Sequence, residues 1–229
     1  MTTVSGFLLI LLLAFFLKNV VKADPLNPQV LDVNSTQYHR NYPEWSAKWW
    51  QWALEIPQDK NPIADVDGRY CAVNQNLSSQ VWFLAGTGGG RADRQCTIPH
   101  GVSLFFPILS TECSYAEDST LKSPRDLLKC AKEERASSLQ ASIDGTQLRN
   151  LESYRVDSPI FKFTFPEKNI FGAPSGQTQG VSDGWFLMLK PLKPGHHVVE
   201  FRGQTAASAT PTLPGDVYVT ISKYNIDSK

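Results

Sequence analysis

Short apolar runs separated by turn-forming residues dominate the chain after residue 80. Six of these runs are rich in β-branched and aromatic residues: VWFLAG from Val81, SLFFPIL from Ser103, PIFKFTF from Pro159, GWFLMLKPL from Gly184, HHVVEF from His196 and VYVTISKY from Val217. Such runs, bounded by Gly, Pro, Asn or Asp, are typical of β-strands. Asp144 followed by Gly145 predicts a tight turn between two further short strands. The pattern predicts a mainly β protein: a single-domain β-sandwich, jelly-roll or immunoglobulin-like, with one or two helices.

Two segments carry helix signals instead. Pro43 suits the first turn of a helix, and Pro57 ends that helix after Ile56. In the second segment, Ser123 can cap a helix that has Pro124 at its first position and continues through LLKCAKEERASSLQA.

The first helix carries four tryptophans: Trp45, Trp49, Trp50 and Trp52. At 100° per residue, three of them share one face, whereas Trp50 projects from nearly the opposite side. The resulting apolar arc is wider than a helix on a protein surface needs. Either the helix lies between two layers with its tryptophans buried, or one tryptophan face lines a groove.

The chain has four cysteines: Cys71, Cys96, Cys113 and Cys130. In an oxidising compartment this even number predicts two disulfides, for which three connectivities exist. We favour Cys71–Cys96 and Cys113–Cys130, because neighbours in sequence most easily become neighbours in space. The second bond would tie the second helix to the strand that ends near Cys113. Zinc sites usually use closely spaced cysteine pairs, and none is present here, so we predict neither a metal nor a cofactor.

The N-terminal segment MTTVSGFLLILLLAFFLKNVVKAD has the features of a secretory signal peptide. Its apolar run from Phe7 to Leu17 is about half of the roughly 20 residues that cross a bilayer as a helix. Val21 and Ala23 are small residues at the positions expected before a cleavage site. We therefore predict that residues 1–23 are removed and that residues 24–229 form one secreted or periplasmic domain without a transmembrane span. An uncleaved N-terminal anchor is the alternative.

Charge gives little reason to expect a charged macromolecular partner. The formal net charge is zero, from 22 basic and 22 acidic residues. This balance favours neither nucleic acid nor an anionic membrane. Sequons at Asn34 and Asn76 are possible N-glycosylation sites if the source performs that chemistry.

The glycines from Gly86 to Gly90 match a phosphate-binding loop only in part. Arg91 stands where the third glycine of a dinucleotide fingerprint belongs, and no helical pattern follows whose N-terminus could hold a pyrophosphate. The lysine of a nucleoside-triphosphate loop is missing too. We interpret these glycines as a flexible hairpin connection between two strands.

The segment Gly180-Val-Ser-Asp-Gly184 satisfies the pattern G-x-S-x-G, but not its structural context. A nucleophile elbow needs a helix after its serine, and the WFLML that follows Ser182 is typical of a strand. His196 and His197 lie downstream and are easily explained as the start of another strand. We therefore predict no catalytic serine.

The acidic residues show no pattern that selects a catalytic pair or a metal site. Asp65 and Asp67 suggest a calcium loop, but Ile63 and Asn74 occupy positions where that loop needs ligands. Six carboxylates remain as candidates for glycoside hydrolysis, which depends on how far apart the fold places them. They are Glu44, Asp65, Asp67, Asp93, Glu112 and Asp183.

Five longer segments carry a resemblance to known proteins: WSAKWWQWALEIP, NPIADVDGRYC, VWFLAGTGGGRADRQCTIPHGVSLFFPIL, IDGTQLRNLESYRVDSPIFKFTFP and SDGWFLMLKPLKPGHHVVEFRG. Together they resemble a family of exported microbial proteins of unknown function. The resemblance implies that the first two cysteine segments and the LKPLKPGHH turn belong to one shared scaffold. It implies no activity.

The sequence thus favours an exported, disulfide-stabilised, non-catalytic domain. Such a domain would bind a glycan or a protein partner, or serve an envelope or structural role. The four tryptophans, Trp45, Trp49, Trp50 and Trp52, are the predicted ligand-binding residues. The alternative is a secreted, glycosidase-like hydrolase whose acidic residues converge in a cleft.

Overall fold

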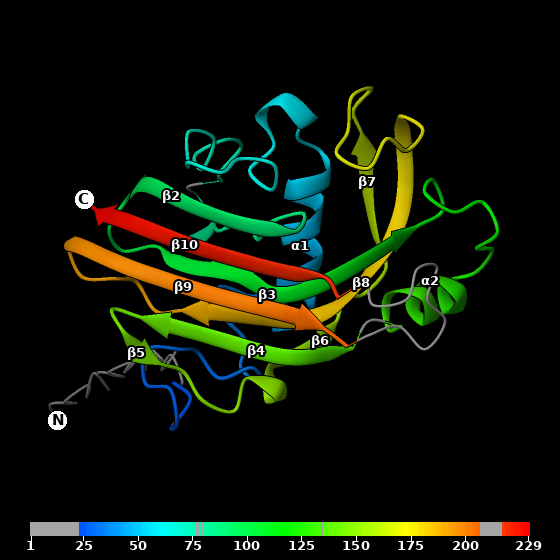
Figure 1. Ribbon diagram of the computed structural model, residues 1–229. Helices are drawn as coiled ribbons and strands as arrows, with labels where there is room; N and C mark the ends of the chain where they lie inside the picture. The colour runs from blue at the N-terminus through cyan, green and yellow to red at the C-terminus, as the bar shows by residue number, and fades with distance from the viewer. Residues whose placement is uncertain (1–22, 77, 79, 134, 207–216) are drawn as a thin grey trace, which may run out of the picture.

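The computed structural model in Figure 1 describes residues 23–76, 78, 80–133, 135–206 and 217–229. Its α-helices are α1 (Tyr42–Leu54) and α2 (Pro124–Ala131), with short 3-10 helices at Gln58–Lys60 and Leu151–Tyr154. Its strands are β1 (Val81–Phe83), β2 (Gly90–Ile98), β3 (Ser103–Ser114), β4 (Ala136–Ile143), β5 (Thr146–Gln147), β6 (Arg155–Asp157), β7 (Phe161–Phe165), β8 (Gly176–Leu189), β9 (Gly195–Thr205) and β10 (Val219–Ser228). Residues 1–22 lie outside the described residues, so the signal peptide and its cleavage after Ala23 stay predictions.

The strands form two five-stranded sheets packed face to face (Figure 1). The first sheet has the order β1-β3-β8-β6, with β7 also paired to β8. The second sheet has the order β2-β10-β9-β4-β5. Each sheet contains one parallel pair, β1 with β3 and β10 with β2, among otherwise antiparallel neighbours. This architecture confirms the predicted mainly β sandwich with two helices.

The first sheet is covered on both faces. Towards the second sheet, Phe106 stacks on Phe201 with ring centroids 4.6 Å apart. Gly203 allows the two layers to come this close, because a Cβ at that position would lie 2.6 Å from the carbonyl oxygen of Ile108. On the opposite face, Phe105 and its stacked partner Phe186 pack against the tryptophans of α1. Burial on both faces explains why β3 and β8 are almost continuously apolar rather than alternating.

Helix α1 begins where its capping residues place it. Asn41 accepts a hydrogen bond from the backbone N–H of Glu44, and the Glu44 carboxylate accepts one from the N–H of Asn41, which completes a capping box. Pro43 lies in the first turn, as expected. The helix ends at Leu54, two residues before the predicted end at Ile56.

The second helix is shorter than predicted. It ends at Ala131, and residues 136–141, which the sequence predicted as its last turns, belong instead to strand β4. β4 pairs with β9 along most of its length, from Ala136 opposite Thr205 to Ile143 opposite Val199. Ladder pairing with β9 therefore outweighs the weak local preference of ASSLQASI for a helix.

Both disulfides join the pairs that sequence proximity favours. Cys71 bonds to Cys96, with Cα atoms 6.2 Å apart, and Cys113 bonds to Cys130, with Cα atoms 6.1 Å apart. The second bond ties α2 to the end of β3, as predicted. It belongs to a small apolar cluster that also contains Leu127, Ala131 and Val181.

The glycine segment after β1 is not the hairpin that the sequence predicted. β1 belongs to the first sheet, whereas β2 belongs to the second, so residues 84–89 carry the chain from one layer to the other. They still connect two strands, but those strands are not paired with each other. A sandwich needs such crossings, and glycines suit them because they adopt backbone angles that other residues avoid, as Gly89 does at φ 114°.

A buried guanidinium fixes this crossing. Arg94, on β2, is 1% exposed and donates hydrogen bonds of 2.7–3.0 Å to four backbone carbonyl oxygens. The acceptors are Pro62 and Asp65 in the loop after α1, and Ala85 and Gly86 in the crossing segment. The same guanidinium lies 5.2 Å from the ring centroid of Tyr224. One side chain thus holds the loop after α1, the crossing segment and β10 together.

We predict that Arg94→Met lowers the free energy of unfolding by at least about 3 kcal/mol, because it leaves four buried carbonyls without their donor. Arg91→Met is the matched control, since Arg91 is exposed on the same strand and should change the stability by less than about 0.5 kcal/mol. Urea unfolding of both variants with the disulfides intact measures the difference. Equal stabilities would show that the Arg94 contacts do not hold the crossing.

Candidate binding cavity

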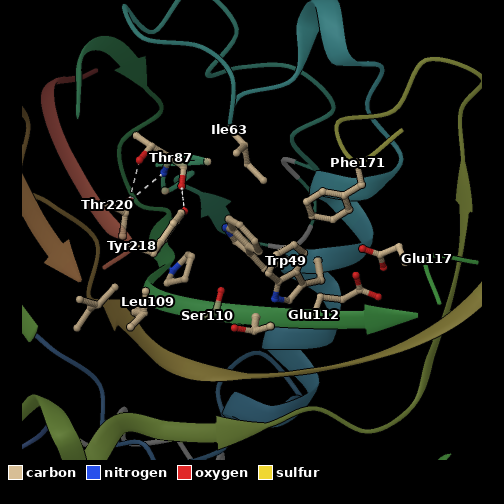
Figure 2. A pocket seen from close by; sticks show the side chains of 16 residues that line it. Trp49, Ile63, Thr87, Leu109, Ser110, Glu112, Glu117, Phe171, Tyr218 and Thr220 are labelled. Carbon is tan, nitrogen blue, oxygen red and sulfur yellow. Dashed lines mark hydrogen bonds between the residues drawn. The ribbon is translucent and has the colours of Figure 1, made fainter. Parts of the chain in front are cut away.

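A cavity of about 330 Å³ opens between α1, the crossing segment, strand β3 and the start of β10 (Figure 2). Aromatic rings form much of its wall, namely Trp49 and Trp50 of α1, Phe171 of the loop between β7 and β8, and Tyr218 before β10. Ser110, Glu112 and Glu117 supply polar groups along β3 and just beyond it. The volume is at the lower end of the range for small-molecule sites.

The cavity exists because β1 is short. β1 pairs with β3 only from Val81 opposite Ser103 to Phe83 opposite Phe105. The chain then leaves for the second sheet, and no described strand pairs with that edge of β3 further along. The free edge is covered by side chains of α1 and by the crossing segment, and these leave space between them.

The crossing segment forms one wall of the cavity. Gly86 and Gly88 line it on either side of Thr87. The Thr87 backbone N–H donates to Oγ1 of Thr220, and the Tyr218 hydroxyl donates to the carbonyl oxygen of Thr87, so β10 holds this wall in place (Figure 2). The glycines that suggested a phosphate loop are therefore part of a candidate site, with no helix N-terminus behind them.

Two of the four predicted tryptophans reach the cavity. All four are buried, with Trp45 and Trp49 2% exposed, Trp50 6% and Trp52 7%. The indole N–H groups of Trp45, Trp49 and Trp52 donate to the carbonyl oxygens of Gln37, Leu84 and Val73, respectively. Nε1 of Trp50 is buried and has no hydrogen-bond partner among the described residues. Trp49 and Trp50 line the cavity, whereas Trp45 and Trp52 lie in the core beside Phe83.

Glu112 is the least expected residue in the cavity wall. It is only 7% exposed, and neither of its carboxyl oxygens has a hydrogen-bond partner among the described residues. Burial raises the pKa of Glu112 well above its ordinary value, and the neighbouring Glu117 carboxyl raises this pKa further. Glu117 itself accepts a hydrogen bond from Ser114. Figure 2 shows both acids at the same end of the cavity. Burial and the neighbouring Glu117 carboxyl therefore both favour the neutral form of Glu112.

Strand β8 makes room for this carboxyl. Glu112 lies opposite Ser182 in the β3–β8 ladder, and a Cβ on Gly180 would collide with the Oε1 atom of Glu112. Both residues belong to the G-x-S-x-G segment, which runs inside a continuous strand and forms no nucleophile elbow. His196 and His197 contact Asp227 and Asp144 instead. In this protein the small residues of the motif leave space for an acid on the neighbouring strand.

The other five candidate acids form hydrogen bonds or ion pairs outside the cavity. Asp65 accepts hydrogen bonds from the backbone N–H groups of Asp67, Gly68 and Tyr70. Asp183 pairs with Arg155, Asp67 with Arg69 and Asp93 with Lys223, and Glu44 caps α1. Of the six acids proposed from sequence, only Glu112 lines the cavity. Within the described ranges, no three His, Cys, Asp or Glu side chains are grouped so that they could hold a metal ion.

Several cavity residues were not found from the sequence. Glu117, Phe171 and Tyr218 come from loops, and no spacing in the chain links them to α1 or to Glu112. The one available signal was Glu112 itself, an acid inside the otherwise apolar and hydroxyl-bearing run SLFFPILSTEC. Asn34 and Asn76, the sequon asparagines, lie in exposed turns away from the cavity.

Comparison with protein-family models and with curated protein sequences gives no match. The resemblance to exported microbial proteins therefore stays a prediction, and the function must be argued from the cavity. Among the described residues, no helix has the length and apolar character needed to cross a bilayer.

We predict that Glu112 makes the protein less stable as the pH rises. The native state keeps the proton above the unfolded pKa of about 4.3, so the free energy of unfolding falls from there up to the raised native pKa, by about 1.4 kcal/mol per pH unit. Glu112→Gln removes this contribution and should flatten the curve, whereas Glu200→Gln, an exposed acid on β9, should not. Urea unfolding between pH 4 and 8 tests this, and parallel curves for wild type and Glu112→Gln would refute a buried neutral acid.

Proposed function

We propose that this protein is an exported, disulfide-stabilised domain that binds a small molecule in the cavity beside α1. One observation carries the proposal: Glu112 and Trp50 line the cavity, and the Glu112 carboxyl oxygens and the Trp50 indole nitrogen are buried without a hydrogen bond of ordinary geometry in the described chain. A buried polar group without a partner costs about 1–3 kcal/mol. A ligand that supplies the missing partners recovers that cost on binding.

The cavity supports an enclosed ligand better than a surface-bound polysaccharide. Stacking on a glycan surface requires an exposed aromatic face, and no tryptophan of α1 is more than 7% exposed. With about 30 Å³ for each water molecule, the cavity has room for about ten water-sized groups. A single sugar unit fits within that volume and remains one candidate ligand.

A second candidate function is hydrolysis, and the observation that favours it is the contact between two acids. Glu117 helps to keep the Glu112 carboxyl protonated, and a neutral acid beside a second carboxylate can act as a general acid. Glycosidases, however, separate their carboxyls by about 5 Å or more to leave room for the sugar carbon or for water. Retained cleavage of aryl glycosides by Glu200→Gln but not by Glu112→Gln would favour the hydrolase.

Export is part of the same proposal. The two disulfides are typical of proteins that fold in an oxidising compartment, and the predicted signal peptide supplies a route to it. N-glycosylation at Asn34 and Asn76 belongs to this proposal as well, since both asparagines are exposed.

The test is ligand-observed NMR on the purified chain with both disulfides formed. The probes are methyl α-glucoside, benzylammonium chloride, benzyl alcohol and sodium benzoate at millimolar concentrations. We expect at least one probe to bind and to lose affinity at least about tenfold in Trp50→Phe or Glu112→Gln, which corresponds to about 1.4 kcal/mol. Glu200→Gln should bind as the wild type does. Binding by no probe, or binding that ignores both cavity variants, would overturn the proposal.

A further inference from the structure

Glu112 is an exception among the buried acids of the described chain. Asp65 receives three backbone N–H groups, and Asp183 receives the guanidinium of Arg155. The carboxyl oxygens of Glu112 make no hydrogen bond of ordinary geometry with any described residue, and their polar neighbour is a second acid, Glu117. Because a second acid cannot balance the charge of an ionised Glu112, a partner for that charge is best sought outside the chain.

The ionisable side chains around Glu112 include acids but no bases. The cavity lining contains three titratable side chains, Glu112, Glu117 and Tyr218, and no lysine, arginine or histidine. From β8, Glu112 faces Gly180 and Ser182, neither of which carries a charge. A site with two acids, aromatic walls and no base complements a cation, because aromatic faces also attract positive charge.

The same pair of strands already holds a cation in this way on its other face. Asp183 lies opposite Thr111, one position from the Glu112–Ser182 pair, and is 2% exposed. The Arg155 guanidinium donates to Asp183 from 2.6 Å and lies 4.5 Å from the ring centroid of Trp185. An acid and a tryptophan thus bind a cation on that face. The Glu112 face also has an acid and tryptophan rings, but no cationic side chain lines the cavity there.

We propose that the cavity binds a primary ammonium group, which donates hydrogen bonds to the Glu112 carboxylate while its apolar body lies against Trp49, Trp50 and Phe171. This inference rests on the proposed function and names its ligand class. A primary ammonium has three N–H donors and can serve both oxygens of Glu112, whereas a quaternary ammonium has none. The predominantly aromatic and aliphatic wall, which includes Ile63 and Leu109, suits an arylalkyl or alkyl body.

Binding of an ammonium ion must release a proton. Below the raised pKa of Glu112 the empty site holds a neutral acid, whereas the bound site holds a carboxylate paired with the ammonium, so a proton leaves to the buffer on binding. Glu117 shifts the pH at which this happens but carries the same sign of charge. The affinity should therefore rise with pH by up to about tenfold per unit until Glu112 ionises in the empty protein as well.

Isothermal titration calorimetry with benzylammonium chloride tests the inference at pH 6 and pH 8, in pairs of buffers with different ionisation enthalpies. We expect binding at both pH values, tighter at pH 8, with up to one proton released at pH 6. Benzyl alcohol and methyl α-glucoside should bind at least about tenfold more weakly. Glu112→Gln should bind benzylammonium at least about tenfold more weakly and release no proton, while Glu200→Gln behaves as the wild type.

The outcomes separate the inference from the proposed function. Equal or better binding of benzyl alcohol or the glucoside at the same cavity would overturn the ammonium ligand and leave the binding function standing. Binding of benzylammonium without proton release by the wild-type protein would overturn the role of Glu112, whatever the stability of the variant. Binding of none of these probes would overturn both. An acetylated tripeptide containing lysine, run in parallel, distinguishes a free amine from the lysine side chain of a protein as the source of the ammonium.

Discussion

The arrangement of the cavity depends on the hydrogen bonds of Arg94. No carboxylate of the described residues forms an ion pair with its buried guanidinium, which is stabilised instead by carbonyl oxygens of two separate loops and by the ring of Tyr224. Burying an arginine is costly unless its donors are satisfied, so the loops that satisfy them cannot drift without exposing the charge to an apolar environment. One of these loops carries Ile63 and the other carries Gly86, which lie on two walls of the cavity. The shape of the site is therefore set by a polar contact made on a different strand, in the second sheet.

Burial of the first sheet on both faces determines the residue pattern along β3 and where the cavity begins. A sheet buried on both faces needs apolar residues at consecutive positions, and β3 supplies them from Leu104 to Leu109. The next positions on the α1 side of β3 are Ser110, Glu112 and Ser114, and they lie opposite Gly184, Ser182 and Gly180 of β8. A Cβ on Gly184 would collide with Ser110, and one on Gly180 would collide with Glu112, so the glycines of β8 make room for the polar side chains of β3. The change from a filled core to a lined cavity takes place within a single strand.

Sequence reasoning predicted the features that depend on local chemistry. Pro43 in the first turn of α1, the Ser123 cap of α2, the turn at Asp144 and Gly145, and the two disulfides were all predicted from short stretches of sequence. It failed where distant segments decide the outcome. The segment after Ala131 that was predicted as helix forms part of β4, because it pairs with β9. The glycines predicted as a hairpin connect the two sheets, because β1 and β2 pair with different strands. Only two of the four tryptophans predicted as ligand-binding residues line the cavity, because the indole N–H groups of the other two donate to carbonyl oxygens in the core. The meeting of Glu112 with Glu117, Phe171 and Tyr218 has no signature in the sequence, because three different loops and a strand bring them together.

The burial of Glu112 is the main argument for the proposed binding site over a packing defect. An apolar residue of similar size at this position would stabilise the empty fold, because a buried acid without a partner costs about 1–3 kcal/mol. Gly180 and Ser182 admit this acid, since a Cβ on Gly180 would collide with the Oε1 atom of Glu112. The acid that these small residues admit lies on a cavity lined by aromatic rings. Under the proposed function, a ligand with hydrogen-bond donors and an apolar body would meet two carboxyl groups and several aromatic rings on one cavity.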